Sequence, residues 1–244
     1  MNTETESRLI DLNRQFYQTF ALQFSATRGR IQPGVRRVLA DLPREADVLD
    51  LGCGNGGLAR ELARQGYTGT YVGLDFSEGL LSVACQGLPE NYTFFQADLS
   101  SPGWDEALGK RVFAYVLAFA VLHHLPGQAL RRRLLQTVRT HLPAGRRLIH
   151  SEWQFLHSQR LRARIQPWET IGLAAGQVDD GDYLLDWRAG GSGLRYAHHF
   201  SEAELADLAQ DSGFHVLDTF YSDGQGGRLG LYQVWENQPC PTLS

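Results

Sequence analysis

The feature that most constrains the fold is a regular alternation of short apolar runs with amphipathic stretches between residues 43 and 151. Short apolar runs are typical of strands, and apolar residues three or four positions apart are typical of helices. Strands that alternate with helices pair in parallel through right-handed crossovers, which predicts an α/β fold with a doubly wound sheet. The expected strands are 47–51, 70–74, 92–96, 112–120 and 147–151, and the expected helices are 58–65, 78–85 and 128–141.

Further elements flank this core on both sides. Residues 3–25 and 33–42 are expected to form two helices that pack as an N-terminal cap, and 201–212 another helix, which opens on an S-x-x-E capping box. Residues 215–221 and 229–236 are expected to complete the sheet as a hairpin. The prediction is a Rossmann-like, seven-stranded, mostly parallel sheet with helices on both faces and an antiparallel last strand.

Composition excludes several classes of protein. Cys53, Cys85 and Cys240 are scattered and show no C-x-x-C spacing, so neither a disulfide framework nor a metal site is expected. The longest apolar run, 112–122, is about half of what a bilayer span needs, and residues 1–10 lack the features of a signal peptide. The expected location is the cytoplasm, with no membrane contact.

Charge is unevenly distributed, although the net formal charge is only −4. Residues 128–164 carry nine arginines against Glu152 alone, whereas residues 165–244 carry three arginines against 12 acids. The arginine-rich stretch has two interpretations: a solvated helix face, or a local patch for an anionic substrate.

The turn after the strand expected at 47–51 is rich in glycine. Gly52, Gly54 and Gly57 follow that strand directly and precede a helix, which is the arrangement of a loop that binds a ligand at a helix N-terminus. Glycine lets the backbone turn sharply and approach a ligand without a Cβ in the way. The spacing also satisfies G-x-G-x-x-G, with Asp75 at the end of the next strand, so a dinucleotide is one possible ligand.

Asp50 separates the two possible ligands. It stands at the strand tip two residues before Gly52, where it would repel the pyrophosphate of a dinucleotide and attract an ammonium group. S-adenosylmethionine carries such an ammonium group, and its ribose still needs an acid such as Asp75. A third acid, Asp98, ends the third strand, where it can accept a hydrogen bond from adenine while the Leu99 backbone reads the ring edge. These residues predict S-adenosylmethionine as the cofactor.

The same motifs resemble those of the class I S-adenosylmethionine-dependent methyltransferases. The segment Asp50-Leu51-Gly52-Cys53-Gly54-Asn55-Gly56 is similar to their first motif, Asp75 and Asp98 to their second-strand and third-strand acids, and Val121-Leu122-His123-His124-Leu125 to a segment after their fourth strand. The resemblance covers about residues 35–150 and implies a methyltransferase. The predicted cofactor-binding residues are Tyr17, Arg28, Asp50, Gly52, Cys53, Gly54, Asn55, Asp75, Phe76, Ser77, Asp98, Leu99, Ala118, Phe119 and Leu122.

Three shorter segments resemble the tRNA methyltransferases that esterify the carboxymethyl group on wobble uridine. They are Phe24-Ser25-Ala26-Thr27-Arg28, Gly181-Asp182-Tyr183-Leu184-Leu185-Asp186-Trp187 and Arg195-Tyr196-Ala197-His198-His199-Phe200. In that family the first segment belongs to the N-terminal cap and the other two lie in an insertion beside the active site. The resemblance implies a tRNA acceptor, with a small molecule as the main alternative, and no particular protein partner is predicted.

A carboxylate acceptor would need cations rather than a general base. The candidates are Arg28, Arg195, His198 and His199. For His198 and His199, a structural hydrogen-bonding role is an equal alternative, and for His123 and His124 it is the favoured one.

Two other classes of function stay open. An NAD-dependent oxidoreductase would leave Asp50 and the terminal hairpin unexplained, and a non-catalytic S-adenosylmethionine-binding module would keep the same motifs.

The predicted units are the helical cap (1–42), the cofactor-binding core (43–151), the insertion (152–199), the C-terminal helix and hairpin (200–236) and a tail (237–244).

Overall fold

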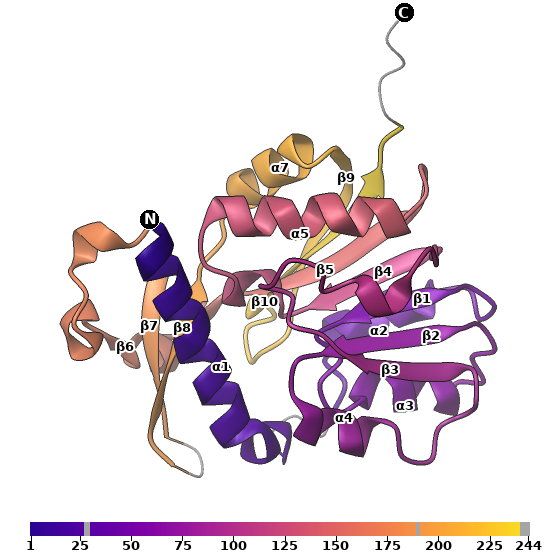
Figure 1. Cartoon of the computed structure of the whole chain (residues 1–244), viewed down its shortest axis with the longest axis horizontal. Coiled ribbons are helices and arrows are strands. Elements are labelled where there is room, and N and C mark those ends of the chain that lie inside the picture. The colour runs from indigo at the N-terminus through magenta and orange to yellow at the C-terminus, as the bar shows by residue number, and fades with distance from the viewer. Residues whose placement is uncertain (27–29, 189–190, 240–244) are drawn as a thin grey trace, which may run out of the picture.

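The main sheet of the protein has seven strands. In the computed structural model, which describes residues 1–26, 30–188 and 191–239, the strand order is β3-β2-β1-β4-β5-β10-β9 (Figure 1). All neighbouring pairs are parallel except those of β10, which runs antiparallel to both β5 and β9. The strands are β1 (Val48–Leu51), β2 (Tyr71–Asp75), β3 (Tyr92–Gln96), β4 (Tyr115–Phe119), β5 (Arg147–Trp153), β9 (Phe214–Ser222) and β10 (Gly230–Asn237).

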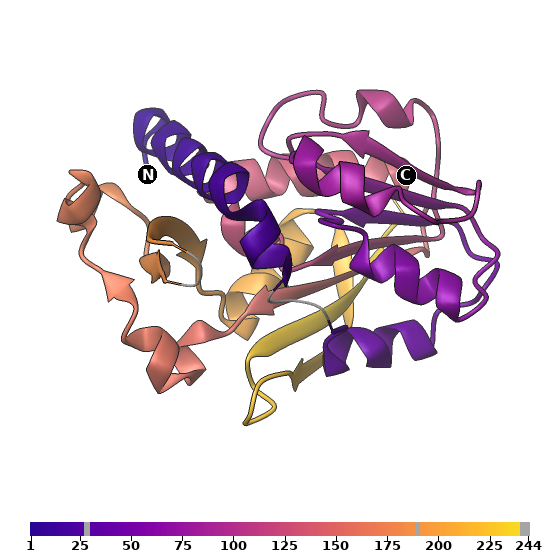
Figure 2. The ribbon, with the colours of Figure 1, turned by 90° about the horizontal axis from the view of Figure 1, so that it is seen from below.

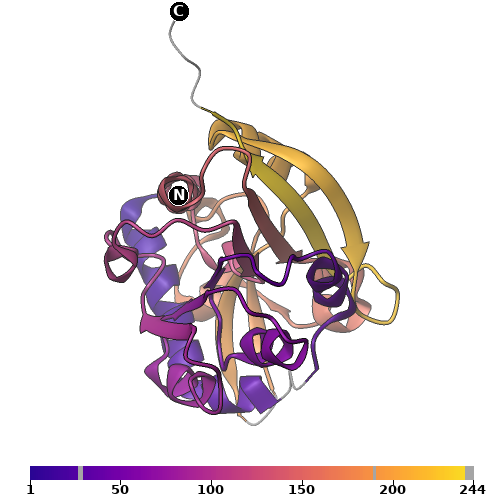
Figure 3. The ribbon, with the colours of Figure 1, turned by 90° about the vertical axis from the view of Figure 1, so that its right-hand side faces the viewer.

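Helices cover both faces of this sheet. Apolar residues of α5 and α7 pack on one face with Leu49 and Leu51 of β1, whereas α2 and α3 pack on the other face with Val48. Figure 3 shows the β9–β10 hairpin at one edge of the sheet. The helices are α1 (Thr3–Ala26), α2 (Pro33–Ala40), α3 (Gly57–Arg64), α4 (Glu78–Ala84), α5 (Gln128–His141), α6 (Gln159–Arg162) and α7 (Glu202–Asp211).

The predicted fold is confirmed, with differences at element boundaries. The strand expected at 112–120 is β4, which lies between β1 and β5 as its two apolar faces predict. It begins only at Tyr115, because Val112 is 55% exposed and the Phe113 backbone N–H donates to the carbonyl of His141. The strand expected to end at residue 151 continues to Trp153, since β10 pairs with it over that length.

The part of the chain between β5 and α7 contributes a smaller sheet with the order β6-β7-β8. Its strands are β6 (Ile165–Gln166), β7 (Asp182–Trp187) and β8 (Gly193–His198), and the pairs are antiparallel. Leu9 of α1 packs against Leu184 and Tyr196 of this sheet. Helix α1 therefore lies between the two sheets, whereas α2 packs on the main sheet (Figures 1 and 2). The short 3₁₀ helices are η1 (Glu106–Leu108), η2 (Leu122–His124), η3 (Phe155–His157), η4 (Trp168–Ile171) and η5 (Ala175–Gln177).

A buried polar network fastens the smaller sheet to the core. Arg131 of α5 donates to the hydroxyl of Tyr196 and to the carbonyl of Leu125, and the Tyr196 hydroxyl donates to Asp182. These side chains are at most 6% exposed, so their hydrogen bonds offset the cost of burying charge. In the part of the chain that is described, no helix is long and apolar enough to cross a membrane.

Candidate active site

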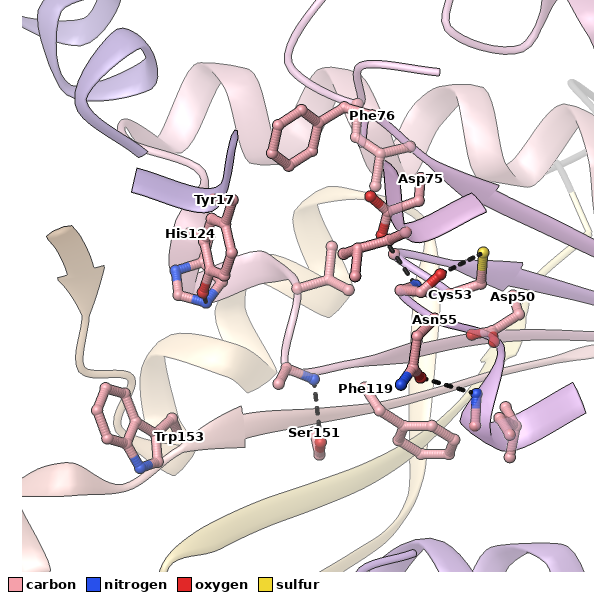
Figure 4. Close-up of a pocket in the computed structure, with 18 of the residues that line it drawn as sticks. Tyr17, Asp50, Cys53, Asn55, Asp75, Phe76, Phe119, His124, Ser151 and Trp153 are labelled. Atoms are coloured by element: carbon pink, nitrogen blue, oxygen red, sulfur yellow. Dashed lines mark hydrogen bonds between the residues drawn. The ribbon is translucent and has the colours of Figure 1, made fainter. Parts of the chain in front are cut away.

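A cavity of about 440 Å³ lies where the parallel strands of the main sheet end. Much of its lining comes from the last residues of β1, β2, β4 and β5 and from the segments that follow β1 to β4, which is the usual place for ligands in a doubly wound sheet. Helix α1 contributes Asn13, Arg14 and Tyr17 to the opposite wall. The close-up in Figure 4 shows Asp50, Asn55 and Asp75 on one side of the space and the pair Tyr17 and His124 on the other.

The glycine-rich turn forms the floor of the cavity after β1. Gly52 and Gly54 have φ values of +69° and +55°, in the left-handed region that favours glycine. A Cβ on Gly52 would lie 2.9 Å from the Val121 side chain, so only glycine lets the loop pass this closely beneath the segment after β4. The Asn55 side chain accepts from the backbone of Gly57 at 3.2 Å and fixes the start of α3.

Asp75 organises this loop as well as facing the cavity. One of its carboxylate oxygens accepts from the backbone N–H of Gly54 and the other from that of Ser77, both at 2.9 Å. Burial raises the pKa of Asp75, and the backbone hydrogen bonds oppose that shift. Each carboxylate oxygen has a further lone pair, so Asp75 can still accept hydrogen bonds from ribose hydroxyls.

Asp50 is the most deeply buried acid that lines the cavity near this loop, with 3% exposure. The Tyr71 hydroxyl donates a hydrogen bond to it. Burial raises the pKa of Asp50 to about 7, and the nearby Asp75 adds to the shift, whereas the Tyr71 hydrogen bond opposes it. A ligand ammonium group would compensate this buried charge, which is what the sequence predicted for Asp50.

Asp98 is already engaged from the side of α1. One carboxylate oxygen accepts from the backbone and hydroxyl of Ser100, and the other accepts from Arg14 at 2.6 Å. Burial would raise the pKa of Asp98, but the hydrogen bonds from Ser100 and Arg14 outweigh it and the pKa lies below its usual value. The sequence pattern did not single out Arg14, because an arginine on a polar helix face is normally only solvated.

The other half of the cavity holds the predicted cofactor-binding residue Tyr17 together with Asn13, His124 and Trp153, which the sequence analysis did not assign to the site. The Tyr17 hydroxyl lies 2.7 Å from Nε2 of His124. The side-chain oxygen of Asn13 accepts from the backbone N–H of Tyr196 at 2.8 Å. Its side-chain nitrogen donates to the carbonyls of Tyr196 and His124, both at 3.1 Å. Trp153 completes this half from the end of β5 (Figure 4). We refer to the region between Tyr17, His124 and Trp153 as the acceptor half.

Glu152 lies behind the acceptor half and is 1% exposed. One of its oxygens accepts from the backbone N–H of His123 and lies 2.8 Å from Nδ1 of that histidine, and the other lies 2.9 Å from Nδ1 of His150. Burial would raise the pKa of Glu152, but the two histidines outweigh it and the pKa is lowered. The carboxylate is therefore satisfied within the protein.

Most of the predicted cofactor-binding residues meet in the cavity, but some do not. Ser77 caps the N-terminus of α4, and Ala118 and Leu122 are buried in the core. Arg28 lies outside the described residues. Those that line the cavity are Tyr17, Asp50, Gly52, Cys53, Gly54, Asn55, Asp75, Phe76, Asp98, Leu99 and Phe119.

The predicted acceptor-binding cations are placed differently from one another. Arg195 is 5% exposed and stands behind the cavity lining, where its Cζ lies 4.5 Å from the ring centre of the cavity residue Trp153. His198 lies away from the cavity lining. Its Nδ1 lies 2.7 Å from a carboxylate oxygen of Asp182, and its Nε2 lies 2.7 Å from one of Glu204. Burial opposes protonation of His198, but these two acids raise its pKa.

His199 is also away from the cavity lining. It packs edge-on against Phe155, and burial together with the neighbouring His157 lowers its pKa to about 4. His198 thus has the structural hydrogen-bonding role that the sequence left open, whereas His199 has a packing role, and we propose neither as an acceptor-binding group.

The arginine-rich stretch is not one continuous patch. Arg131 is 3% exposed, Arg132 pairs with Asp211, and Arg133 donates to the carbonyl of Ser100. These three arginines are engaged within the protein, whereas Arg160 and Arg162 of α6 are exposed. Both interpretations of the stretch stay open, and among its arginines we keep the exposed pair on α6 as the candidate patch for an anionic substrate.

Comparisons with known proteins identify the family of this chain. Residues 24–219 match the family model described as a methyltransferase domain. A protein of Encephalitozoon cuniculi with a methyltransferase name is 34% identical over 210 residues, which cover 84% of this chain and 87% of that protein. The Schizosaccharomyces pombe tRNA (carboxymethyluridine(34)-5-O)-methyltransferase is 23% identical over 91% of this chain and 95% of its own length. A solved structure described as a SAM-dependent methyltransferase, from Methanosarcina mazei, has a TM-score of 0.63 and 24% identity over 85% of this chain and 98% of that one.

The fold and the cavity therefore define an enzyme of the methyltransferase class. The chain belongs to the methyltransferase domain family. The cofactor of this class, S-adenosylmethionine, fits the cavity because the buried acids Asp50 and Asp75 stand beside a glycine loop that leaves room for a ligand. Asp50 would hold the ammonium group and Asp75 the ribose hydroxyls.

Proposed function

We propose that this methyltransferase esterifies the carboxymethyl group of a wobble uridine in tRNA, with S-adenosylmethionine as methyl donor. The carrying observation is the placement of Arg195. Its strand, β8, pairs with β7, and the hairpin brings the guanidinium against Trp153 at the wall of the acceptor half. A buried positive charge at this place favours an anionic acceptor, since few water molecules screen it.

Two further observations support a carboxylate as acceptor. Both oxygens of Glu152 are engaged by hydrogen bonds with His123 and His150, which reduces the repulsion that this carboxylate exerts on an anion in the cavity. The Schizosaccharomyces pombe relative, which is named for this reaction, aligns with 91% of this chain and thus with both strands of the hairpin as well as the core.

Methyl transfer to a carboxylate mainly requires that the enzyme position the donor and the acceptor. When bound, S-adenosylmethionine supplies a methyl group on a positive sulfonium. A carboxylate is already ionised at neutral pH, so the chain needs no general base for it and has no proton to remove. Asp50 and Asp75 would orient the cofactor, α1 and the small sheet would exclude water, and Arg195 would stabilise the acceptor anion electrostatically.

The ester itself provides the test. Purified protein would be incubated with tritium-labelled S-adenosylmethionine and tRNA that carries unmethylated carboxymethyluridine. We expect label in the tRNA that nuclease digestion converts to nucleosides and that mild alkali releases as volatile methanol, because alkali cleaves methyl esters but not N-methyl, C-methyl or ether groups.

Asp75→Ala is the cofactor-binding control and should lose the labelling, because donors of the ribose would be left poorly paired. Label that resists alkali would exclude an ester. Label that survives nuclease treatment in a small molecule of a cell extract, with none in tRNA, would favour the small-molecule acceptor.

A further inference from the structure

We infer that Trp153 is the surface on which the acceptor stacks, and that the acceptor therefore presents a planar heteroaromatic ring such as a nucleobase. This inference rests on the proposed methyl transfer in this cavity and names the residue that selects the acceptor. It concerns the shape of the acceptor, whereas the proposed function concerns the atom that is methylated.

The position of Trp153 points to this role. It is the last residue of β5, it follows the cavity residues Ser151 and Glu152, and it lines the acceptor half across from Tyr17 and His124 (Figure 4). Its partner across the β5–β10 ladder is Gly230, which also lines the cavity. Trp153 is thus a large flat side chain at the edge of an open space.

Trp153 is more exposed than the three tryptophans of the protein core, although it also packs against the apolar cluster around Phe155. Trp104, Trp168 and Trp235 are at most 9% exposed and belong to apolar clusters. Trp153 is only half-buried and lines the cavity. The part of the indole that faces the cavity is apolar surface left unburied. A ring that stacks on it would bury that surface, which favours binding.

The indole is also held in one orientation. The guanidinium of Arg195 lies over its ring at 4.5 Å, and the Phe155 ring centre lies 5.1 Å away. Such support reduces the entropy that a side chain loses on binding. Because Arg195 itself is over the rings of Phe16 and Trp187 at 5.5 and 5.7 Å, the support reaches from β5 through β8 to α1.

Stacking on aromatic side chains is the usual way in which proteins hold unpaired bases, and it tolerates any base because each has a π face. Stacking on Trp153 would place a carboxylate substituent of the ring within the field of Arg195. A neutral aliphatic acceptor of the same size would gain neither interaction.

The test compares Trp153→Leu, which keeps apolar volume but removes the ring, with Trp153→Phe, which keeps a ring. For the acceptor tRNA we expect Trp153→Leu to raise KM about tenfold or more, and Trp153→Phe to raise it less than about threefold. The dissociation constant of S-adenosylhomocysteine and the Tm should stay near wild type in both variants, which shows that the cofactor half and the fold are intact. If S-adenosylhomocysteine binding also fails in Trp153→Leu, the tryptophan has only a structural role and the inference is overturned.

Binding of the free nucleoside 5-carboxymethyluridine, followed by quenching of tryptophan fluorescence with S-adenosylhomocysteine present, gives a second readout. The quenching should be lost in Trp153→Phe. Alkali-labile tRNA labelling with an unchanged acceptor KM in Trp153→Leu would overturn the stacking inference and leave the proposed function standing. Alkali-stable label with a raised acceptor KM would do the reverse.

Discussion

At the scale of single residues, Asp50 should make cofactor binding depend on pH. Burial and the nearby Asp75 raise its pKa to about 7, against the hydrogen bond from Tyr71, and an ammonium group binds the ionised carboxylate. Below about pH 7 the affinity for S-adenosylhomocysteine should fall by up to about tenfold per pH unit. At still higher pH it should fall again, once the ligand's α-amino group loses its proton. Calorimetric titrations across this range measure the curve.

Asp50→Asn is the control for this assignment. The variant should bind S-adenosylhomocysteine weakly and without the decrease on the acid side. Because the folded-state pKa of Asp50 lies above the unfolded value, its ionisation removes stability as pH rises from about 4 to about 7. Asp50→Asn should therefore be more stable than wild type at pH 8, by on the order of 1–3 kcal/mol. An unchanged acid limb in Asp50→Asn would assign that limb to another group.

At the scale of elements, α1 should control how fast the cofactor leaves. Arg14 on this helix pairs with Asp98 at 2.6 Å, and Asn13 one residue earlier bonds β8 and the segment after β4. The Arg14 side chain is 37% exposed, so the ion pair is weak and sensitive to salt. We expect Arg14→Gln to speed S-adenosylhomocysteine dissociation by about two- to fivefold, as measured by stopped-flow fluorescence.

Arg8→Gln is the matched control on the same helix, because Arg8 bonds the carbonyl of Ile171 and not Asp98. High salt should speed dissociation from the wild type and from Arg8→Gln, but not from Arg14→Gln. Equal rates in all three proteins would show that the Arg14–Asp98 pair does not retain the cofactor.

At the scale of the whole molecule, the exposed arginines of α6 should contribute to tRNA binding. The net charge is −4, so a polyanion needs a local basic surface. Arg160 and Arg162 are exposed on α6, seven and nine positions after Trp153. Reversing both to Glu should weaken tRNA binding at least about tenfold and make it less sensitive to salt, because fewer phosphates are neutralised. Filter retention at several salt concentrations measures both effects.

The matched control reverses Arg146 and Arg147 to Glu. These two arginines are exposed where β5 begins, at the opposite end of that strand from the cavity. That variant should retain tRNA like the wild type. If the two double variants behave alike, the effect is one of net charge and α6 is not a tRNA contact.

The sequence by itself determined the parts of this protein that depend on local pattern. Apolar periodicity predicted the strands and helices of the sheet, and the hairpin at its edge. The acids Asp50, Asp75 and Asp98 could be placed at one edge of the sheet because the carboxyl ends of parallel strands meet there. The ligand-binding turn could be predicted from Gly52 and Gly54, because its left-handed backbone conformation favours glycine at both positions.

The tertiary structure alone decided which distant side chains share the cavity. Asn13, Arg14 and Trp153 belong to a helix face and a strand end that look ordinary in sequence, and only the docking of α1 over the strand ends brings them together. The partners of Arg131 and His198 could not be predicted either, because they lie on elements far away in the chain. Burial and pairing depend on contacts far apart in the chain, and a local pattern carries no information about them.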